Sequence, residues 1–378
     1  MVLKKIIVEN FRNIKHAEME FSPNANIFFG DNAQGKTNLL EAVSVALGKS
    51  FRNARGNSFT PFNNPEATTR IRLSYESESV PNKINEIDYQ SNQEKTTVKI
   101  NEIPFKKAND LYGEFKYVVF IPDNLNLIKG YPDVRRSYLD NIAIMQNKSY
   151  REFLTKYKDA LKQRCTAYIS RIYDKEILSV WDDILIKQGI NLTYGRLKYL
   201  NLISKYTGGI YKKLSGGERI SISYFSDVFG KIYELDASNK ENLYGIYKRS
   251  LNETVSEGQS GRTPGAHRDD VVFFVKTKQD YEQNRRGFNA RSYASQGQLR
   301  SIAVSLKLAE AGIIRNFNRE NPVVLLDEVL GELDSNRRSF IIKHFDDSQV
   351  FITSCNVNDF KNIPGLKMWR VKNGEFVE

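Results

Sequence analysis

The stretch GDNAQGKT, residues 30–37, constrains the fold more than any other part of the sequence. It matches the pattern GxxxxGK[ST], in which glycines allow a tight turn and backbone N–H groups surround a phosphate. A buried-strand pattern at 27–29 precedes the loop, and apolar residues recur at helical spacing from Leu39 to Ala46. The sequence therefore predicts an α/β fold with a strand–loop–helix unit that binds a nucleoside triphosphate.

The chemistry of this loop assigns a role to each side chain. The loop opens a helix, whose positive N-terminal end favours phosphate. We expect Lys36 to reach the β- and γ-phosphates and the Thr37 hydroxyl to ligate Mg²⁺, so ATP and Mg²⁺ are the predicted cofactors. The predicted ATP contacts in the loop are Gly30, Asp31, Asn32, Ala33, Gln34, Gly35, Lys36, Thr37 and Asn38.

A hydrolase of this kind also needs a carboxylate at the end of a buried strand. The stretch NPVVLLDEVLGELDSNRR (321–338) supplies one, since four aliphatic residues are followed by Asp327 and Glu328. We expect Asp327 to hold a Mg²⁺-bound water and Glu328 to act as the general base, beside Lys36 as the third catalytic residue. The alternative is a buried strand followed by an acidic turn without a catalytic role. The presence of a phosphate loop in the same chain makes this alternative the weaker interpretation.

Two segments compete for the signature of ABC-type ATPases, a Ser-Gly turn that opens a helix shortly before the carboxylate strand. The first, LSGGE at 214–218, begins 113 residues before Asp327 and is followed by the alternating pattern of a strand. We interpret it as a turn that leads into a hairpin. The second, Ser295-Gln296-Gly297-Gln298, opens a helical pattern and lies 32 residues before Asp327. A Ser hydroxyl and a Gly N–H at a helix start suit a γ-phosphate, although an ordinary N-cap has the same residues.

The chain resembles the RecF family of bacterial recombination-mediator ATPases, which are related to the heads of SMC and Rad50 proteins. The resemblance runs through nearly the whole chain. It is carried by NFRN (10–13), GDNAQGKTNLLEAV (30–43), KSFRNAR (49–55), IPDNLNLIKGYPDVRRSYLD (121–140), GAHRDDVVF (265–273), SQGQLRSIAVSLKLAE (295–310) and LLDEVLGELDSNRR (325–338).

The resemblance implies an ATP-dependent dimer, in which each ATP lies between the phosphate loop of one subunit and Ser295, Gly297 and Gln298 of the other. It implies further that Asp334 lies in the loop that crosses this interface, and that Arg12 and Asn13 lie near the nucleotide base. Two features depart from related ATPases. Thr353 and Ser354 stand where transporter-type enzymes have a histidine. No clear glutamine marks the loop that carries one in related ATPases, and residues 121–123 are the best candidate for that loop.

The resemblance implies an ABC-type, SMC/Rad50-head-like ATPase with a short helical second domain in place of a coiled coil. We predict an N-terminal ATPase part (1–125), a helical basic insertion (126–212) and a C-terminal ATPase part (213–378). The insertion should consist of helices of about 24 residues, or about 36 Å. Its aromatic series, which includes Tyr150 and Tyr157, is interpreted as core rather than as a surface on which bases stack.

Positive charge concentrates in the insertion. The chain has a net charge of +11, and residues 148–213 contain fourteen Lys or Arg against six Asp or Glu. This predicts sequence-tolerant binding to DNA phosphates, although a solvated basic face is the simpler alternative. The predicted DNA contacts are Lys156, Lys158, Lys162, Arg164 and Arg171. Arg135 and Arg136 are expected either to touch DNA or to pair with Asp269 and Asp270. The second alternative is slightly favoured.

The family resemblance implies a weak, DNA-dependent ATPase of recombinational repair, replication and the SOS response. Its implied partners are double-stranded and gapped or single-stranded DNA, a second copy of the chain, and mediators resembling RecR and RecO that help to load a recombinase. Two unpaired-looking cysteines, and the lack of a signal peptide or membrane-spanning run, predict a cytoplasmic location. The alternatives are the ATPase subunit of a transporter and the ATPase head of a nuclease complex.

Overall fold

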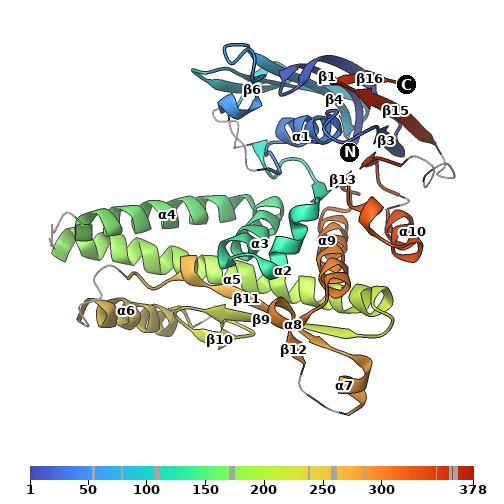
Figure 1. Cartoon of the computed structure of the whole chain (residues 1–378). Helices are drawn as coiled ribbons and strands as arrows, with labels where there is room; N and C mark the ends of the chain where they lie inside the picture. The colour runs from blue at the N-terminus through green and yellow to red at the C-terminus, as the bar shows by residue number, and fades with distance from the viewer. Residues whose placement is uncertain are drawn as a thin grey trace. The chain divides into compact units, whose positions relative to one another are not determined.

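The structure is a computed structural model, and it describes most of the chain. The described residues are 1–52, 56–77, 80–105, 111–169, 175–236, 239–256, 262–283, 285, 287–345, 347–356, 360 and 365–378. They form two compact units, drawn in Figure 1. The first unit comprises Met1–Asp123 and Glu310–Glu378, and the second comprises Asn124–Ala309.

This division corrects the domain boundary that we placed after residue 212. The segment that follows belongs to the second unit because its strands build one sheet there. Strand β9 (Arg219–Ser226) pairs antiparallel with β10 (Gly230–Ile232) on one side and with β11 (Asp270–Lys276) on the other. The C-terminal part of the first unit accordingly begins at Glu310.

The first unit contains two six-stranded sheets. One is antiparallel, with the strand order β2 (Ile14–Glu20), β1 (Val2–Phe11), β4 (Thr69–Ser77), β5 (Val80–Ser91), β6 (Thr96–Ile100) and β7 (Ile103–Pro104). The other has the order β16 (Glu375–Val377), β15 (Leu366–Lys372), β3 (Ala25–Phe29), β14 (Val350–Ser354), β13 (Val323–Asp327) and β8 (Tyr117–Phe120), and only its edge strand β16 is antiparallel.

Helix α1 (Lys36–Ala46) packs between these two sheets, with contacts to β1, β4 and β5 on one side and to β13 and β14 on the other. Nine of its residues are buried, which explains why apolar side chains occur around most of its circumference. Strands β13 and β14 are buried along their full length, as expected for a parallel sheet that is covered on both faces. Helix α10 (Ser335–His344) also belongs to this unit, and short 3-10 turns lie at Gly56–Phe59 and Leu330–Glu332.

The second unit is built on long helices and one four-stranded sheet. Its helices are α2 (Asn126–Lys129), α3 (Pro132–Gln146), α4 (Lys148–Ile169), α5 (Lys175–Leu214), α6 (Lys240–Ser256), α7 (Lys278–Glu282), α8 (Ala290–Tyr293) and α9 (Gln296–Asn318), which continues into the first unit. The short strand β12 (Phe288–Asn289) completes the sheet, and 3-10 turns lie at Pro122–Leu125 and Ala266–Arg268.

Helix α5 has 40 residues, which correspond to about 60 Å. It is therefore far longer than the helices of about 24 residues that we predicted. No proline interrupts it, and two of its glycines, Gly189 and Gly195, lie against the rings of Tyr247 and Tyr150. At Gly195 an added Cβ would lie 2.5 Å from the ring of Tyr150, so a side chain there would push α4 away. Tyr150 and Tyr157 are both buried, as their interpretation as core residues predicted.

A network of buried charges holds the second unit together. The Arg196 guanidinium, which is 3% exposed, makes two hydrogen bonds of 2.8 and 3.0 Å to the Asp140 carboxylate. The carboxylate of Asp269 accepts hydrogen bonds from the Tyr224 hydroxyl and the Asp227 N–H, and burial raises its pKa above the ordinary value. The network connects α3, α5, β9 and the start of β11. Each of these buried charges has hydrogen-bond or ion-pair partners, so none is left as an isolated ion.

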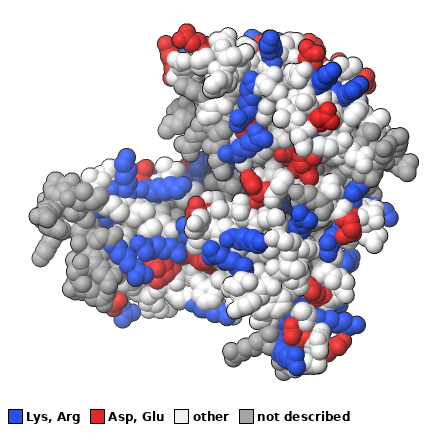
Figure 2. All heavy atoms as spheres, viewed as in Figure 1, with Lys and Arg blue, Asp and Glu red and all other residues white. Residues whose placement is uncertain are grey.

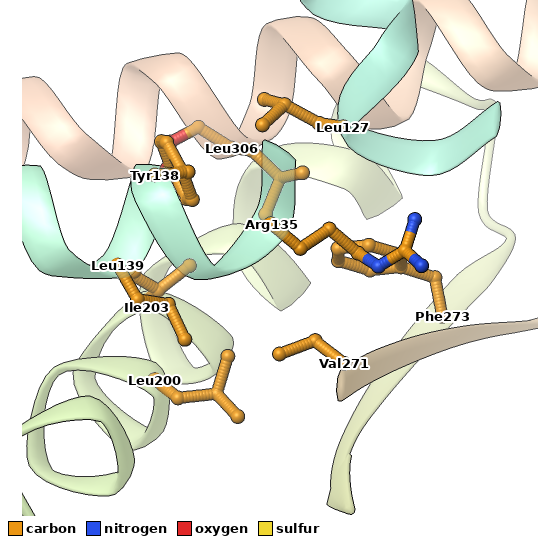
Figure 3. Close-up of a pocket in the computed structure, with 9 residues that line it drawn as sticks. All are labelled: Leu127, Arg135, Tyr138, Leu139, Leu200, Ile203, Val271, Phe273 and Leu306. Atoms are coloured by element: carbon orange, nitrogen blue, oxygen red, sulfur yellow. The ribbon is translucent and has the colours of Figure 1, made fainter. Parts of the chain in front are cut away.

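Arg135 and Arg136 extend this network, as the second of our two alternatives predicted. Arg135 binds the Asp270 carboxylate through two nitrogens at 2.7 and 3.0 Å, and Arg136 donates to the Asp269 carbonyl at 2.8 Å. Figure 3 shows Arg135 reaching along a small pocket toward β11. Apart from Arg135 and Tyr138, the lining is aliphatic or aromatic: Leu127, Leu139, Leu200, Ile203, Val271, Phe273 and Leu306.

Candidate nucleotide site

The predicted phosphate loop and the predicted carboxylates lie together because three parallel strands end at one edge of the sheet. Strand β14 pairs with β3 on one side and with β13 on the other. The loop follows β3, Asp327 ends β13, and Thr353 lies at the end of β14. Parallel strands place these ends side by side, so residues 290 positions apart in the chain come into hydrogen-bond contact.

Lys36 is the central cation of this site. Its side chain is 4% exposed, and its Nζ donates to the carbonyls of Gly30 and Asp31 at 2.8 and 2.9 Å. The same Nζ lies 3.0 Å from the Glu328 carboxylate. The ammonium group is therefore held at the mouth of the loop by two carbonyl oxygens, and it is paired with one carboxylate.

Thr37 and Asp327 place two oxygen ligands in contact. The Thr37 hydroxyl donates to Asp327 Oδ1 at 2.7 Å, and the Thr353 hydroxyl donates to the same oxygen at 2.8 Å. Burial raises the pKa of the Asp327 carboxyl above its ordinary value, although both hydrogen bonds act in the opposite direction. Thr353, which sequence reasoning treated only as a replacement for histidine, thus orients the carboxylate.

Glu328 adopts a backbone conformation that is rare outside glycine, with φ of 54°. Its N–H donates to the Thr353 hydroxyl at 2.9 Å, which helps to hold this conformation. The turn directs the side chain to the Lys36 ammonium, where it remains 29% exposed. Strained backbone of this kind is often retained where a side chain must be aimed at a reacting group.

The phosphate loop is fixed from the β15–β16 side. The Gln34 carbonyl accepts from the Gly374 N–H at 2.8 Å, and its side-chain oxygen accepts from the Asn373 N–H at 2.7 Å. A Cβ at Gly30 would lie 2.3 Å from the Val371 carbonyl, so only glycine fits at the start of the loop. Between these anchors residues 31–33 are exposed.

Arg12 and Asn13, which the family resemblance places near the nucleotide base, lie beside the loop, and both have protein partners. Asn13 donates to the Gln34 carbonyl at 3.2 Å and accepts from Asn38 at 2.7 Å. The Arg12 guanidinium pairs with Glu41, a fully buried carboxylate on α1, at 2.6 Å. Sequence reasoning missed Glu41 because its helical position predicts an ordinary core-facing or solvated residue, and only the fold brings Arg12 to it.

The segment at Ser295 has the geometry of a helix start. The Ser295 hydroxyl accepts from the Gln298 N–H at 3.2 Å, and the Gln298 side-chain oxygen accepts from the Ser295 N–H at 2.9 Å. This reciprocal arrangement is a capping box. Because the Ser295 oxygen is the acceptor, its O–H remains able to donate to another group.

The LSGGE segment does not open a helix. Helix α5 ends at Leu214, residues 215–217 form a turn, and β9 begins at Arg219, which confirms our interpretation. One residue of the segment nevertheless reaches the capping box. Glu218 accepts from the Gln298 amide at 2.8 Å through one oxygen, and from the Tyr211 hydroxyl at 2.6 Å through the other. No pattern in the sequence marks this contact between residues 80 positions apart.

Two further residues complete the description of the predicted site. Asp334 is exposed and caps α10 by accepting from the Arg337 N–H at 2.9 Å. Cys355, which we had considered only as a reduced thiol, lies with its sulfur 3.0 Å from Asn32 Oδ1 and 3.5 Å from Lys36 Nζ. Its position directly after β14 is the signal that could have placed it here.

The predicted DNA contacts differ in their exposure to solvent. Basic side chains gather along the helical part of the second unit (Figure 2), and Lys156, Lys158 and Lys162 are exposed on α4. Arg164 is only 1% exposed, and its guanidinium pairs with Asp182 at 2.6 Å and with Thr263, so we withdraw it as a phosphate contact. Arg171 lies outside the described residues.

The phosphate loop, the carboxylates that end the neighbouring strand, and the buried helix between two sheets define a P-loop ATPase of the ABC type. The family model "RecF/RecN/SMC N terminal domain" matches residues 2–375. "DNA replication and repair protein RecF" of Clostridium acetobutylicum is 32% identical over the full length of both chains, and the RecF protein of Lachnospira eligens is 32% identical over 100% of this chain and 99% of its own. The chain belongs to the RecF family.

Solved structures agree with this assignment. The "recombination mediator protein RecF-ATP in RecFOR pathway" has a TM-score of 0.87 and 28% identity, and the match covers 100% of this chain and 97% of that one. An Smc head domain from Pyrococcus furiosus, with a TM-score of 0.55 and 16% identity over 99% and 95% of the two chains, shares the fold alone. None of the described helices is long and apolar enough to cross a membrane.

Proposed function

We propose that this protein binds and slowly hydrolyses ATP at the loop that contains Lys36. The observation that carries the proposal is the convergence of Lys36, Thr37, Asp327 and Glu328 within hydrogen-bond or ion-pair distance. The related RecF-ATP structure supports ATP as the nucleotide. The N–H groups of the exposed residues 31–33 and the Lys36 ammonium would bind the phosphates.

Glu328 is the proposed general base. Its carboxylate is partly exposed, so it can accept a proton from a water molecule that attacks the γ-phosphate. The 3.0 Å ion pair with Lys36 holds this carboxylate in position before ATP enters. Lys36 would then exchange part of this contact for the phosphate oxygens.

Thr37 and Asp327 fit a Mg²⁺ ion. A hydroxyl and a carboxylate oxygen in contact are the hard ligands that this ion prefers, with its other positions left to phosphate and water. Mg²⁺ there would neutralise charge on the β- and γ-phosphates. Thr353 fixes the carboxylate orientation, since it donates to the same oxygen as Thr37.

We propose further that the site is composite, with Ser295, Gly297, Gln298 and Asp334 of one copy closing over the ATP of the other. The free donor of the Ser295 hydroxyl suits a γ-phosphate oxygen. ATP would close the dimer around DNA, and hydrolysis would open it. The named relatives support a role in replication and repair, and the RecFOR pathway supports RecR- and RecO-like partners. The transporter and nuclease alternatives lack a comparable observation.

Turnover per chain should depend on protein concentration if the site is composite. We expect the rate of phosphate release per chain at saturating ATP to fall steadily on dilution, because monomers lack half of the site. The measurement is steady-state phosphate release over a wide dilution series, with dimerisation followed in parallel by light scattering. A rate per chain that stays constant when only monomers remain would contradict the proposal.

Glu218 should act as a positioning residue for the signature. In Gln298→Glu, the new carboxylate still caps Ser295 but faces the Glu218 carboxylate where a 2.8 Å hydrogen bond now exists. We expect turnover at saturating ATP to fall by about 10-fold, since two close carboxylates repel each other. Adding Glu218→Gln should restore most of it, because the new amide can donate to the new carboxylate.

ATP binding to the phosphate loop serves as the internal control of this swap. Measured on dilute monomer, it should remain within about 3-fold of wild type in Gln298→Glu, in Glu218→Gln and in the double variant, because residues 218 and 298 lie outside the loop. The coupling free energy between the two substitutions should be about 1–2 kcal/mol, as for other residues in direct contact. A double variant no more active than Gln298→Glu alone would show that Glu218 has no such role.

A further inference from the structure

From residue 184 to its C-terminal end, the exposed side of α5 carries positive charge only. Residues 184–217 contain no Asp or Glu, although they contain Lys187, Arg196, Lys198, Lys205, Lys212 and Lys213. Arg196 is buried in the core network, and the five lysines are exposed. Exposed helices usually alternate their charges, so a carboxylate-free stretch of this length requires an explanation.

Four of these lysines form one straight line. Lys187, Lys198, Lys205 and Lys212 are separated by 11, 7 and 7 residues, and at 3.6 residues per turn these spacings keep them on the same side of the helix. Tyr194 and Asn201 are exposed between them on that side. The line from the first to the last lysine is about 37 Å long. We call these six residues the lysine face.

The lysine face is not neutralised by the protein. Within the described part of the chain, none of its four lysines forms an ion pair. The α4 surface differs, since the exposed carboxylates of Glu152 and Asp159 lie among its lysines in the sequence. The positive potential of the second unit is therefore more concentrated along α5 than along α4, where the sequence had led us to place it.

We propose that the lysine face binds the sugar–phosphate backbone of duplex DNA. This inference rests on the proposed DNA-binding function and assigns it a surface. The length of the face matches one turn of duplex, about 34–36 Å, so its lysines can follow phosphates along one side. Lysine contacts phosphate as a point charge and needs no base-specific geometry, which fits sequence-tolerant binding.

An acidic protein partner suits this surface less well. Protein interfaces are built around buried aromatic or aliphatic anchors, and the lysine face offers only Tyr194, which is 45% exposed. The neighbouring hairpin adds to the polar character instead. Asn201 donates to the Tyr233 carbonyl at 3.0 Å, and this places Lys231 and the exposed Tyr233 ring beside the face. A stacked cation and ring widen the surface available to a nucleic acid.

The test compares two triple variants that remove the same charge. In Lys198→Gln/Lys205→Gln/Lys212→Gln, duplex affinity should fall by about 10²-fold near 0.1 M salt, and the slope of log affinity against log salt should decrease by about 3, one unit per lost phosphate contact. In Lys156→Gln/Lys158→Gln/Lys162→Gln on α4, the slope should change by less than about 1. Affinity is measured by fluorescence anisotropy with a duplex of mixed sequence, with ATP, across a salt series.

A charge-retaining variant, Lys198→Arg/Lys205→Arg/Lys212→Arg, should bind like the wild type, which separates charge from shape. Thermal unfolding of all variants checks that the exposed substitutions leave the fold intact. Equal losses in the α4 and α5 variants, or a loss in the α4 variant alone, would overturn the placement on α5 while leaving DNA binding itself intact. A wild-type protein without salt-dependent DNA affinity would overturn the proposed DNA-binding function as well.

Discussion

Replacing Glu328 with glutamine should stop ATP turnover while leaving ATP binding intact. The two side chains have the same shape, but the amide cannot accept the proton of the attacking water. General bases of this kind contribute about 10²–10⁴-fold to a rate, and we expect a loss in that range. The ATP-bound dimer should accumulate, because hydrolysis is the step proposed to open it. Phosphate release, ATP affinity and light scattering measure the three effects.

The matched control is Glu86→Gln, which removes a carboxylate from an exposed position on β5 in the same unit. It should turn over ATP like the wild type. Should Glu328→Gln keep turnover within about 10-fold of wild type, Glu328 would not be the base, since that loss is below the range of general-base catalysis. The Lys36 ion pair would then be its main role.

Replacing Lys36 with alanine should abolish ATP-dependent dimerisation. The substitution removes the cation that bridges Gly30, Asp31 and Glu328, and with it the contact proposed for the β- and γ-phosphates. Charge-assisted hydrogen bonds contribute about 1.5–3 kcal/mol, so ATP affinity should fall by about 10- to 150-fold. Isothermal titration measures the affinity, and light scattering with and without ATP measures the dimer.

Lys15→Ala is the matched control, because Lys15 is an exposed lysine on β2 of the same unit. It should bind ATP and dimerise like the wild type. If Lys36→Ala dimerised with ATP as the wild type does, the nucleotide-driven mechanism would be refuted, whatever the effect of that substitution on the rate of hydrolysis.

Local patterns were sufficient where one element carries the signal. The strand before the phosphate loop, the helix after it, the aliphatic strand that ends at Asp327 and the helix that follows Ser295 all occur as predicted. The LSGGE segment was resolved correctly because strand alternation in the next residues outweighs a motif match. In each case a short stretch contains both the pattern and its structural consequence.

Predictions failed where a residue's environment comes from distant parts of the chain. Arg164 looked like a surface cation, but the fold buries it against Asp182 and Thr263. The second unit continues past residue 212 because β9 pairs with β11, a pairing that no local pattern marks. Helix α5 is longer than expected because glycines that weaken an isolated helix instead receive the Tyr150 and Tyr247 rings.

The sequence by itself determined the class of fold, the family and the residues of the phosphate loop and the strand end at Asp327, because backbone turns and helix starts depend on residues close in the chain. Only the tertiary structure decided that Thr353 contacts Asp327, that Glu218 contacts Gln298, and which basic residues remain exposed. Burial and ion pairing join residues that are far apart in sequence, so the lysine face of α5 emerges only when the helix and its neighbours are in place.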